Sequence, residues 1–122
     1  MRTEELRNAV DTLLGRDGSP AGQLDEAAEK YLEGLLWEVL LETQHRPFQT
    51  VKKLEFTYTI RGNEMFVDRK DKSITRATIE LTLKNALKLQ MAGEKVTGPK
   101  KLGTFGASYL WPVFMELGII RK

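Results

Sequence analysis

The sequence contains no cysteine and a single histidine, His45, and these shortages exclude several kinds of site. Without cysteine there is no disulfide, no thiolate metal centre and no cysteine nucleophile. Glu42 and His45 form one Glu-x-x-His pair, whereas a di-iron bundle needs two such pairs and two further carboxylates. The other glutamates of this segment follow one solvated helix face and do not form a catalytic dyad. We therefore expect no enzymatic activity, no metal and no cofactor.

Long apolar runs are also missing. No stretch approaches the roughly 18 apolar residues that a membrane span needs, and the N-terminal residues MRTEELRNAV lack the apolar core of a secretory signal. Hydrophobic residues make up 41% of the 122 residues and charged residues 30%, which is typical of a globular domain. We expect one cytoplasmic domain over residues 1–122, with no membrane partner.

Charge is distributed unevenly along the chain, although the net charge is only +2. Residues 1–50 carry five basic and ten acidic residues, and residues 51–122 carry 14 basic and seven acidic ones. The division therefore falls between a helical, acidic part (1–45) and a basic part (46–122). A basic half can attract phosphate groups through its field and through counterion release. The alternative is two solvated faces without a partner.

Two helices are predicted in the acidic part. Thr3 can act as an N-cap and Gly15 can end a helix, so the first helix should span residues 4–14. Residues 16–22, RDGSPAG, have the composition of a turn. Between residues 23 and 44 a broad apolar stripe lies opposite a row of glutamates and predicts the longest helix.

The apolar stripe of the segment 23–44 is wider than one small core requires. We expect this helix to form a homodimer contact, through Leu32, Leu36, Trp37 and Leu40. The alternative is a central helix that is buried within its own chain.

The apolar period changes from 3.6 to 2 after Pro47. Apolar residues at 54, 56, 58 and 60 alternate with polar ones, which predicts a strand with one apolar face. Gly62 and Asn63 tolerate the positive φ of a tight turn, and Met65–Val67 supply the returning strand. The pattern predicts a hairpin over residues 52–68.

A further helix is predicted from Ser73, as its N-cap, to Gly93, where it stops. The β-branched residues between 74 and 83 leave a strand open as the alternative for that segment. Near the C-terminus we predict a short helix over 112–117 and a last strand at Ile119 and Ile120. Together these elements give an α+β fold, with a helical N-terminal half, a β-hairpin, then a helix and a short C-terminal helix or strand.

Two glycine motifs in the basic part fall short of known phosphate-binding loops. Residues 98–104, GPKKLGT, have the glycine spacing of a Walker loop, but Thr104 stands where that loop needs lysine. Residues 103–106, GTFG, have the GxxG form of a KH domain loop, and a simple glycine-rich turn is the alternative.

One local resemblance points to nucleic acid. Residues 75–79, TRATI, resemble the start of the recognition helix in winged helix-turn-helix DNA-binding domains of the GntR type, and Gly-Thr-Phe at 103–105 is similar to the end of their basic wing. The resemblance covers about a quarter of the chain. A second helix-turn-helix register, over 100–120, is also conceivable. Such a helix implies base-edge contacts from its first turn and phosphate contacts from nearby lysines. The residues are Thr75, Arg76 and Thr78 for the bases, and Lys70, Lys72, Lys100 and Lys101 for the phosphates.

These observations predict a small, non-enzymatic, regulatory protein that binds nucleic acid, DNA in preference to RNA, and forms a homodimer. The alternative is a homodimeric protein–protein interaction or structural module without nucleic acid. Its surface would combine the helix at 23–44 with the aromatic side chains of the C-terminal part, Phe105, Tyr109, Trp111 and Phe114.

Overall fold

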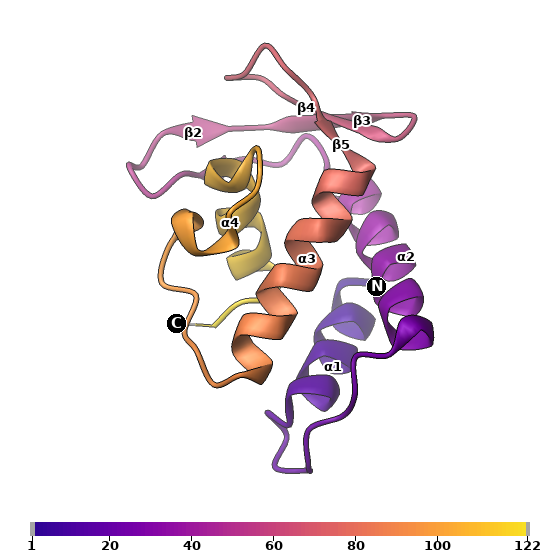
Figure 1. Cartoon of the computed structure of the whole chain (residues 1–122). Helices are drawn as coiled ribbons and strands as arrows, with labels where there is room; N and C mark the ends of the chain where they lie inside the picture. The colour runs from indigo at the N-terminus through magenta and orange to yellow at the C-terminus, as the bar shows by residue number, and fades with distance from the viewer. Residues whose placement is uncertain (1, 122) are drawn as a thin grey trace.

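The computed structural model describes residues 2–121 and has the predicted α+β architecture (Figure 1). Four α-helices form the body of the molecule, and short antiparallel strands lie across one end of α2, α3 and α4. In chain order the elements are α1 (Arg2–Leu14), α2 (Glu26–Thr43), β1 (Phe48–Gln49), β2 (Glu55–Phe56), β3 (Tyr58–Arg61), β4 (Glu64–Val67), β5 (Ile74–Thr75), α3 (Arg76–Met91), the 3-10 helix η1 (Pro99–Leu102) and α4 (Ala107–Glu116). No helix within residues 2–121 is long and apolar enough to cross a membrane.

The two N-terminal helices pack against each other, and each begins at a different place from the predicted one. Thr3 lies inside α1, which already includes Arg2, so it is not the N-cap. In α2 the cap is Asp25, whose carboxylate accepts a hydrogen bond from the Ala28 N–H at 2.8 Å. This bond satisfies one of the free amides of the first turn and starts α2 at Glu26 instead of at residue 23.

The apolar stripe of α2 is covered by the chain itself. Leu32, Leu36, Trp37 and Leu40 are at most 8% exposed and belong to one continuous core with α1, α3, α4 and the strands. The predicted dimer contact through these four residues is therefore wrong. Helical periodicity identified a buried face correctly but could not tell which chain covers it.

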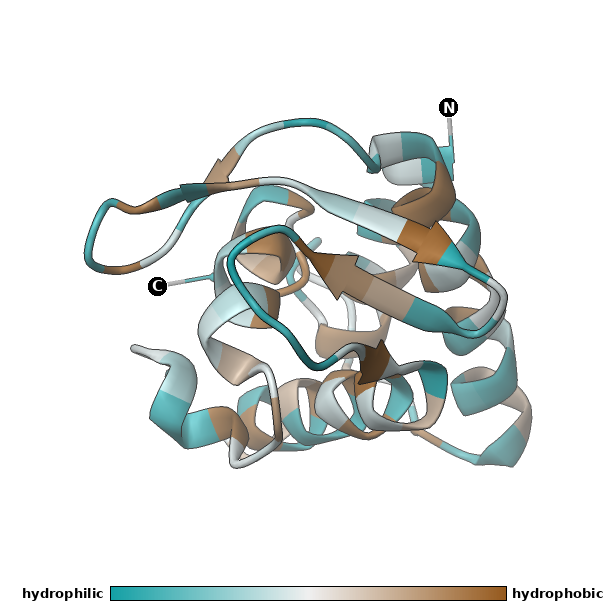
Figure 2. Ribbon diagram, turned by 90° about the horizontal axis from the view of Figure 1, so that it is seen from above, coloured by the Kyte–Doolittle hydropathy of each residue, from teal (hydrophilic) through white to brown (hydrophobic). Residues whose placement is uncertain are grey.

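The turn of the predicted hairpin is confirmed, but the hairpin is shorter than the predicted range 52–68. Gly62 has φ +58° in the turn between β3 and β4, and Tyr58 pairs with Val67. The first part of the predicted hairpin belongs to another one, in which Phe56 of β2 pairs with Phe48 of β1. Figure 2, which looks down on the strands, shows β2 and β3 following one another as one extended segment.

Both interpretations of residues 74–83 contain part of the answer. Ile74 and Thr75 form β5, which pairs with β4, and α3 begins directly afterwards at Arg76. Thr75 caps α3 by accepting a hydrogen bond from the Thr78 N–H at 3.2 Å. Ser73, the predicted cap, instead donates its hydroxyl hydrogen to Glu64. The pairing of β5 with β4 thus moves the start of the helix beyond Ser73.

The C-terminal part is more helical than predicted. The helix α4 spans Ala107–Glu116 and contains Pro112 in its interior. Ile119 and Ile120 form no strand but are buried after the turn at Gly118, where the Ile119 N–H bonds to the Phe114 carbonyl at 2.9 Å. Apolar side chains alone do not define a strand when the chain cannot reach a sheet edge.

Candidate functional site

The predicted base-reading residue, Arg76, is occupied by contacts within the chain. Its Nε donates to Glu80 at 3.1 Å, one turn further along α3, and its guanidinium carbon lies 4.8 Å from the centroid of the Trp37 ring. Its Nη1 also lies 3.5 Å from the Asn63 side-chain oxygen. A guanidinium that is paired and stacked in this way fixes α3 against α2 and the β3–β4 turn, so a base could be read only by the donors that Glu80 does not hold.

The side of α3 that faces α2 is rich in acids. Lys84 pairs with Glu29 at 3.4 Å, so this lysine is partly neutralised. The pKa of Glu33 is raised, first by partial burial and then by the nearby charges of Glu80 and Glu29. A surface that already raises the pKa of a carboxyl through negative charge is a poor place for phosphate.

The two threonines predicted to face base edges are bonded to each other. Thr75 Oγ1 donates to Thr78 Oγ1 at 3.0 Å and accepts from the Thr78 N–H. Beside them, a shallow hollow is lined by the acids Glu64 and Glu80 together with Asn63 and Arg76. Thr75 and Thr78 therefore cap the N-terminus of α3 at the point where the helix follows strand β5.

An aromatic contact links the loop that carries two of the predicted phosphate-binding lysines, Lys70 and Lys72, to the segment that follows η1. Lys70 Nζ lies 4.0 Å from the centroid of the Phe105 ring, which joins the loop 68–73 to the loop 103–106. Gly106 lies directly against Ile74, so that a Cβ there would be 2.4 Å from the Ile74 Cδ1. These two contacts bring Lys70 and its loop against the segment that directly follows η1, and η1 carries Lys100 and Lys101.

The 3-10 helix η1 is fastened to α3 by hydrogen bonds. Asn85 Nδ2 donates to the Leu102 carbonyl at 2.9 Å. Thr82 Oγ1 also lies 2.6 Å from Thr104 Oγ1. Because the Thr82 hydroxyl donates its hydrogen to the Thr78 carbonyl at 2.7 Å, Thr104 is the donor in the contact with Thr82. Leu102 is buried next to these bonds, whereas the two preceding residues, Lys100 and Lys101, remain exposed.

Within residues 2–121, ion pairs involve cations of the helical body and of the C-terminal end only. They join Arg2 to Glu5 and Glu38, Arg16 and Arg121 to Asp11, Lys30 to Glu26, Arg76 to Glu80 and Lys84 to Glu29. Lys70, Lys72, Lys100 and Lys101 take part in none of them. Together with Phe105, these four residues are called the lysine surface below.

A shallow hollow of about 250 Å³ continues the lysine surface along α3. Lys101, Lys88, Asn85, Leu89 and Glu94 line it. Two lysines face one glutamate here, so the hollow keeps a positive balance. Sequence analysis missed Lys88 because its position relative to η1 depends on the hydrogen bond between Asn85 and Leu102.

The segment that resembles a wing does not form strands. Residues 99–102 are the 3-10 helix η1, Gly103–Phe105 lead into α4, and no strand follows α3 within residues 2–121. The Gly-Thr-Phe sequence at 103–105 thus has another structural role: it places the Phe105 ring against Lys70.

Comparisons with protein-family models, curated proteins and solved structures found no match.

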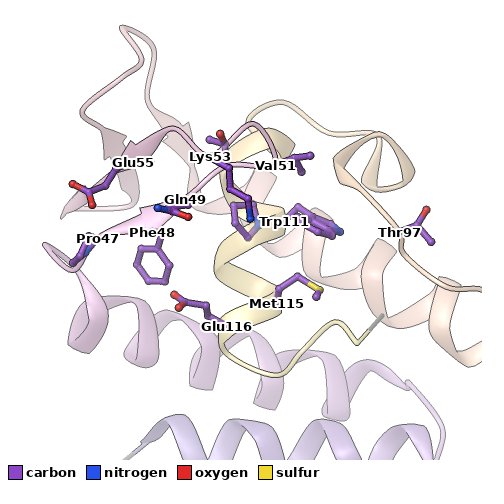
Figure 3. A pocket seen from close by; sticks show the side chains of 12 residues that line it. Pro47, Phe48, Gln49, Val51, Lys53, Glu55, Thr97, Trp111, Met115 and Glu116 are labelled. Atoms are coloured by element: carbon purple, nitrogen blue, oxygen red, sulfur yellow. The ribbon is translucent and has the colours of Figure 1, made fainter.

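A larger hollow, of about 610 Å³, lies between the β1–β2 turn and α4 (Figure 3). Pro47 and Phe48 line it from the start of β1, Val51 from the β1–β2 turn, and Trp111 and Met115 from α4. The indole N–H of Trp111 donates to the Val96 carbonyl at 3.1 Å. Lys53, Glu55 and Glu116 also line this hollow, so its charges do not select a ligand of one sign.

The aromatic residues of the C-terminal part do not form one exposed surface. Phe114 is fully buried, Trp111 is 7% exposed, and Tyr109 packs edge-on against Phe56 with ring centroids 5.0 Å apart. Phe105 alone of the four is well exposed, at 46%. The predicted aromatic surface of the interaction module is therefore wrong for Trp111 and Phe114, which belong to the core.

Searched over residues 2–121, histidine, aspartate and glutamate side chains form no group of three that could hold a metal ion.

Proposed function

We propose that this protein binds nucleic acid through the lysine surface, by contacts to the phosphate backbone. The observation that carries the proposal is the Lys70–Phe105 contact, which joins the basic loop 68–73 to the loop 103–106 directly after the basic helix η1. It brings the loop of Lys70 and Lys72 to the segment directly after η1, which carries Lys100 and Lys101, and within residues 2–121 no ion pair involves these four lysines. Unpaired lysines release counterions when they meet phosphate, which is the main source of backbone affinity.

The location of the acids supports the same surface. Glu29, Glu33 and Glu80 lie on the side of α3 that faces α2, where Arg76 and Lys84 neutralise part of their charge. On the η1 side, Lys88 and Lys101 line a hollow with one acid, Glu94, so we expect a polyanion that approaches α3 to be attracted there. We propose that the nucleic acid is DNA in preference to RNA, that the protein has a regulatory role, and that it acts in the cytoplasm.

The binding is backbone-directed and does not use α3 as a recognition helix. Base edges in a major groove are read by side chains with free donors or acceptors. On α3, Arg76 is held by Glu80, and Thr75 and Thr78 bond to each other. Lysines on loops position a phosphate chain without reading its sequence. We therefore expect weak dependence of affinity on base sequence.

The test compares two variants that each lose two positive charges. Lys100→Ala/Lys101→Ala removes half of the lysines from the lysine surface, and Arg2→Ala/Lys30→Ala removes two cations from α1 and α2. Affinity for a fluorescently labelled oligonucleotide of mixed sequence is measured by anisotropy. We expect the first variant to bind roughly tenfold more weakly than the wild type at physiological salt, and the second to bind nearly as the wild type does. Equal losses in both variants would reduce the effect to net charge and contradict a localised surface.

A further inference from the structure

We infer that the nucleic acid held by the lysine surface is single-stranded, and that Phe105 stacks against one of its bases. This inference rests on the proposed function and adds to it the kind of strand that is bound. It comes from the position of one exposed aromatic ring, which contacts Lys70 and follows the 3-10 helix that carries Lys100 and Lys101. Surfaces that bind single strands combine a positive path for the backbone with aromatic rings for the bases.

Phe105 is exposed in a way that the fold does not require. Its ring is 46% exposed, whereas the neighbouring Leu102 and Ala107 are buried in the core. Gly103 and Gly106, at φ +66° and +80°, flank the two residues Thr104 and Phe105 and turn this short segment outward. Thr104 anchors the segment through Thr82, so the ring is presented from a fixed base.

The cation on Phe105 fits a stacking role. Lys70 Nζ lies 4.0 Å from the ring centroid, so it occupies one face of the ring. The exposed part of the ring remains available to a base, because every base has a flat π surface that stacks without regard to sequence. In that arrangement the ammonium group of Lys70 lies within reach of the phosphate attached to the stacked base.

A duplex does not suit this surface. Its bases are already stacked on each other and are reached only through the grooves, which need a protruding element with free polar side chains. The exposed residues of α3 are Ala77, Leu81, Lys88 and Met91, so Lys88 is the one polar side chain among them, and Leu81 is 50% exposed without a polar atom in its side chain. An unstacked single strand can place a base on Phe105 while its phosphates meet the lysines.

The experiment compares three probes: a single-stranded DNA of roughly 15 nucleotides, an RNA of the same sequence, and the DNA duplex. Each is titrated with the wild type, Phe105→Leu and Phe105→Tyr. We expect the wild type to bind the single strands more tightly than the duplex. Phe105→Leu should weaken single-strand binding roughly 5- to 100-fold and leave duplex binding unchanged, and Phe105→Tyr should restore it.

The salt dependence separates stacking from a merely structural effect. Because stacking releases no counterions, Phe105→Leu should lower single-strand affinity without changing the slope of log K against log salt. A changed slope would mean that the loop of Lys70 has moved, and would overturn the stacking role. Equal wild-type affinity for single strand and duplex, with a salt slope, would overturn the inference and leave the proposed function standing. No binding to any of the three probes would overturn both.

Discussion

Tyr58 makes the stability of this protein sensitive to alkaline pH. Its phenol is 1% exposed, donates to the Leu40 carbonyl at 2.7 Å and lies 2.7 Å from the Thr43 hydroxyl. Burial raises its pKa to about 12, from an ordinary value of 10.0, although the Thr43 hydrogen bond and the charge of Arg46 act in the opposite direction. The fold therefore favours the neutral phenol.

The sign and size of the effect follow from that pKa. Below pH 10 the phenol is protonated in both the folded and unfolded states, and its full contribution is present. As the pH rises from 10 to about 12 the unfolded state loses its proton first, so the free energy of unfolding falls. A difference of two pH units corresponds to a loss of about 2.7 kcal/mol across this window.

Urea denaturation at a series of pH values, from about 8 to about 12, measures this loss in the wild type and in Tyr58→Phe. The variant should be less stable near pH 8 by roughly 1–3 kcal/mol, because the Leu40 carbonyl loses its donor. Its stability should then fall less steeply, so that the two curves converge as the pH rises. Parallel curves for the wild type and Tyr58→Phe would refute the assignment.

Two further predictions concern the surroundings of α3. Gly106→Ala should lower the free energy of unfolding by about 2 kcal/mol or more, since a residue at φ +80° is strained and its Cβ would overlap Ile74. Gly62→Ala, also at positive φ but with open space around it, should cost less in the same urea titration, and equal costs would contradict the packing argument. Glu33→Gln should raise the melting temperature at pH 7, because a carboxyl whose folded pKa is raised loses its stabilising contribution as the pH rises through that pKa. The gain over the wild type should vanish below pH 4, and a gain that persists there would contradict the charge explanation.

Local sequence patterns predicted the elements but not what covers them. The 3.6-residue period found α1, α2 and α3, and Gly62 with Asn63 marked the one tight turn between β3 and β4. The same period cannot show that Leu36 and Leu40 are buried in the core of their own chain and not against a second copy, since both arrangements need the same apolar stripe. The two-residue strand β1 escaped prediction because so short a segment carries no alternation.

The candidate site was predictable in part, and the part that failed depends on contacts between distant residues. A lysine-rich loop signals positive charge from composition alone, and the Lys70–Phe105 contact links the loop of Lys70 and Lys72 to the segment after η1. That these two lysines act together with Lys100 and Lys101 stays a prediction. The sequence does show one partner of Arg76, because Glu80 stands at the i+4 position of the same helix. It does not show that the Trp37 ring of another helix lies against the guanidinium. Neither the exposure of Phe105 nor its contact with Lys70 has a local signature.

The salt dependence of nucleic-acid binding tests the central claim most directly. If each of the four lysines meets one phosphate of a single strand, log K should fall against log salt with a slope of about −3. Lys100→Ala/Lys101→Ala should reduce the size of that slope by about 1.4, whereas Arg2→Ala/Lys30→Ala should leave it unchanged. A wild-type slope near zero, or a slope that the loss of Lys100 and Lys101 does not alter, would contradict the lysine surface as the binding site.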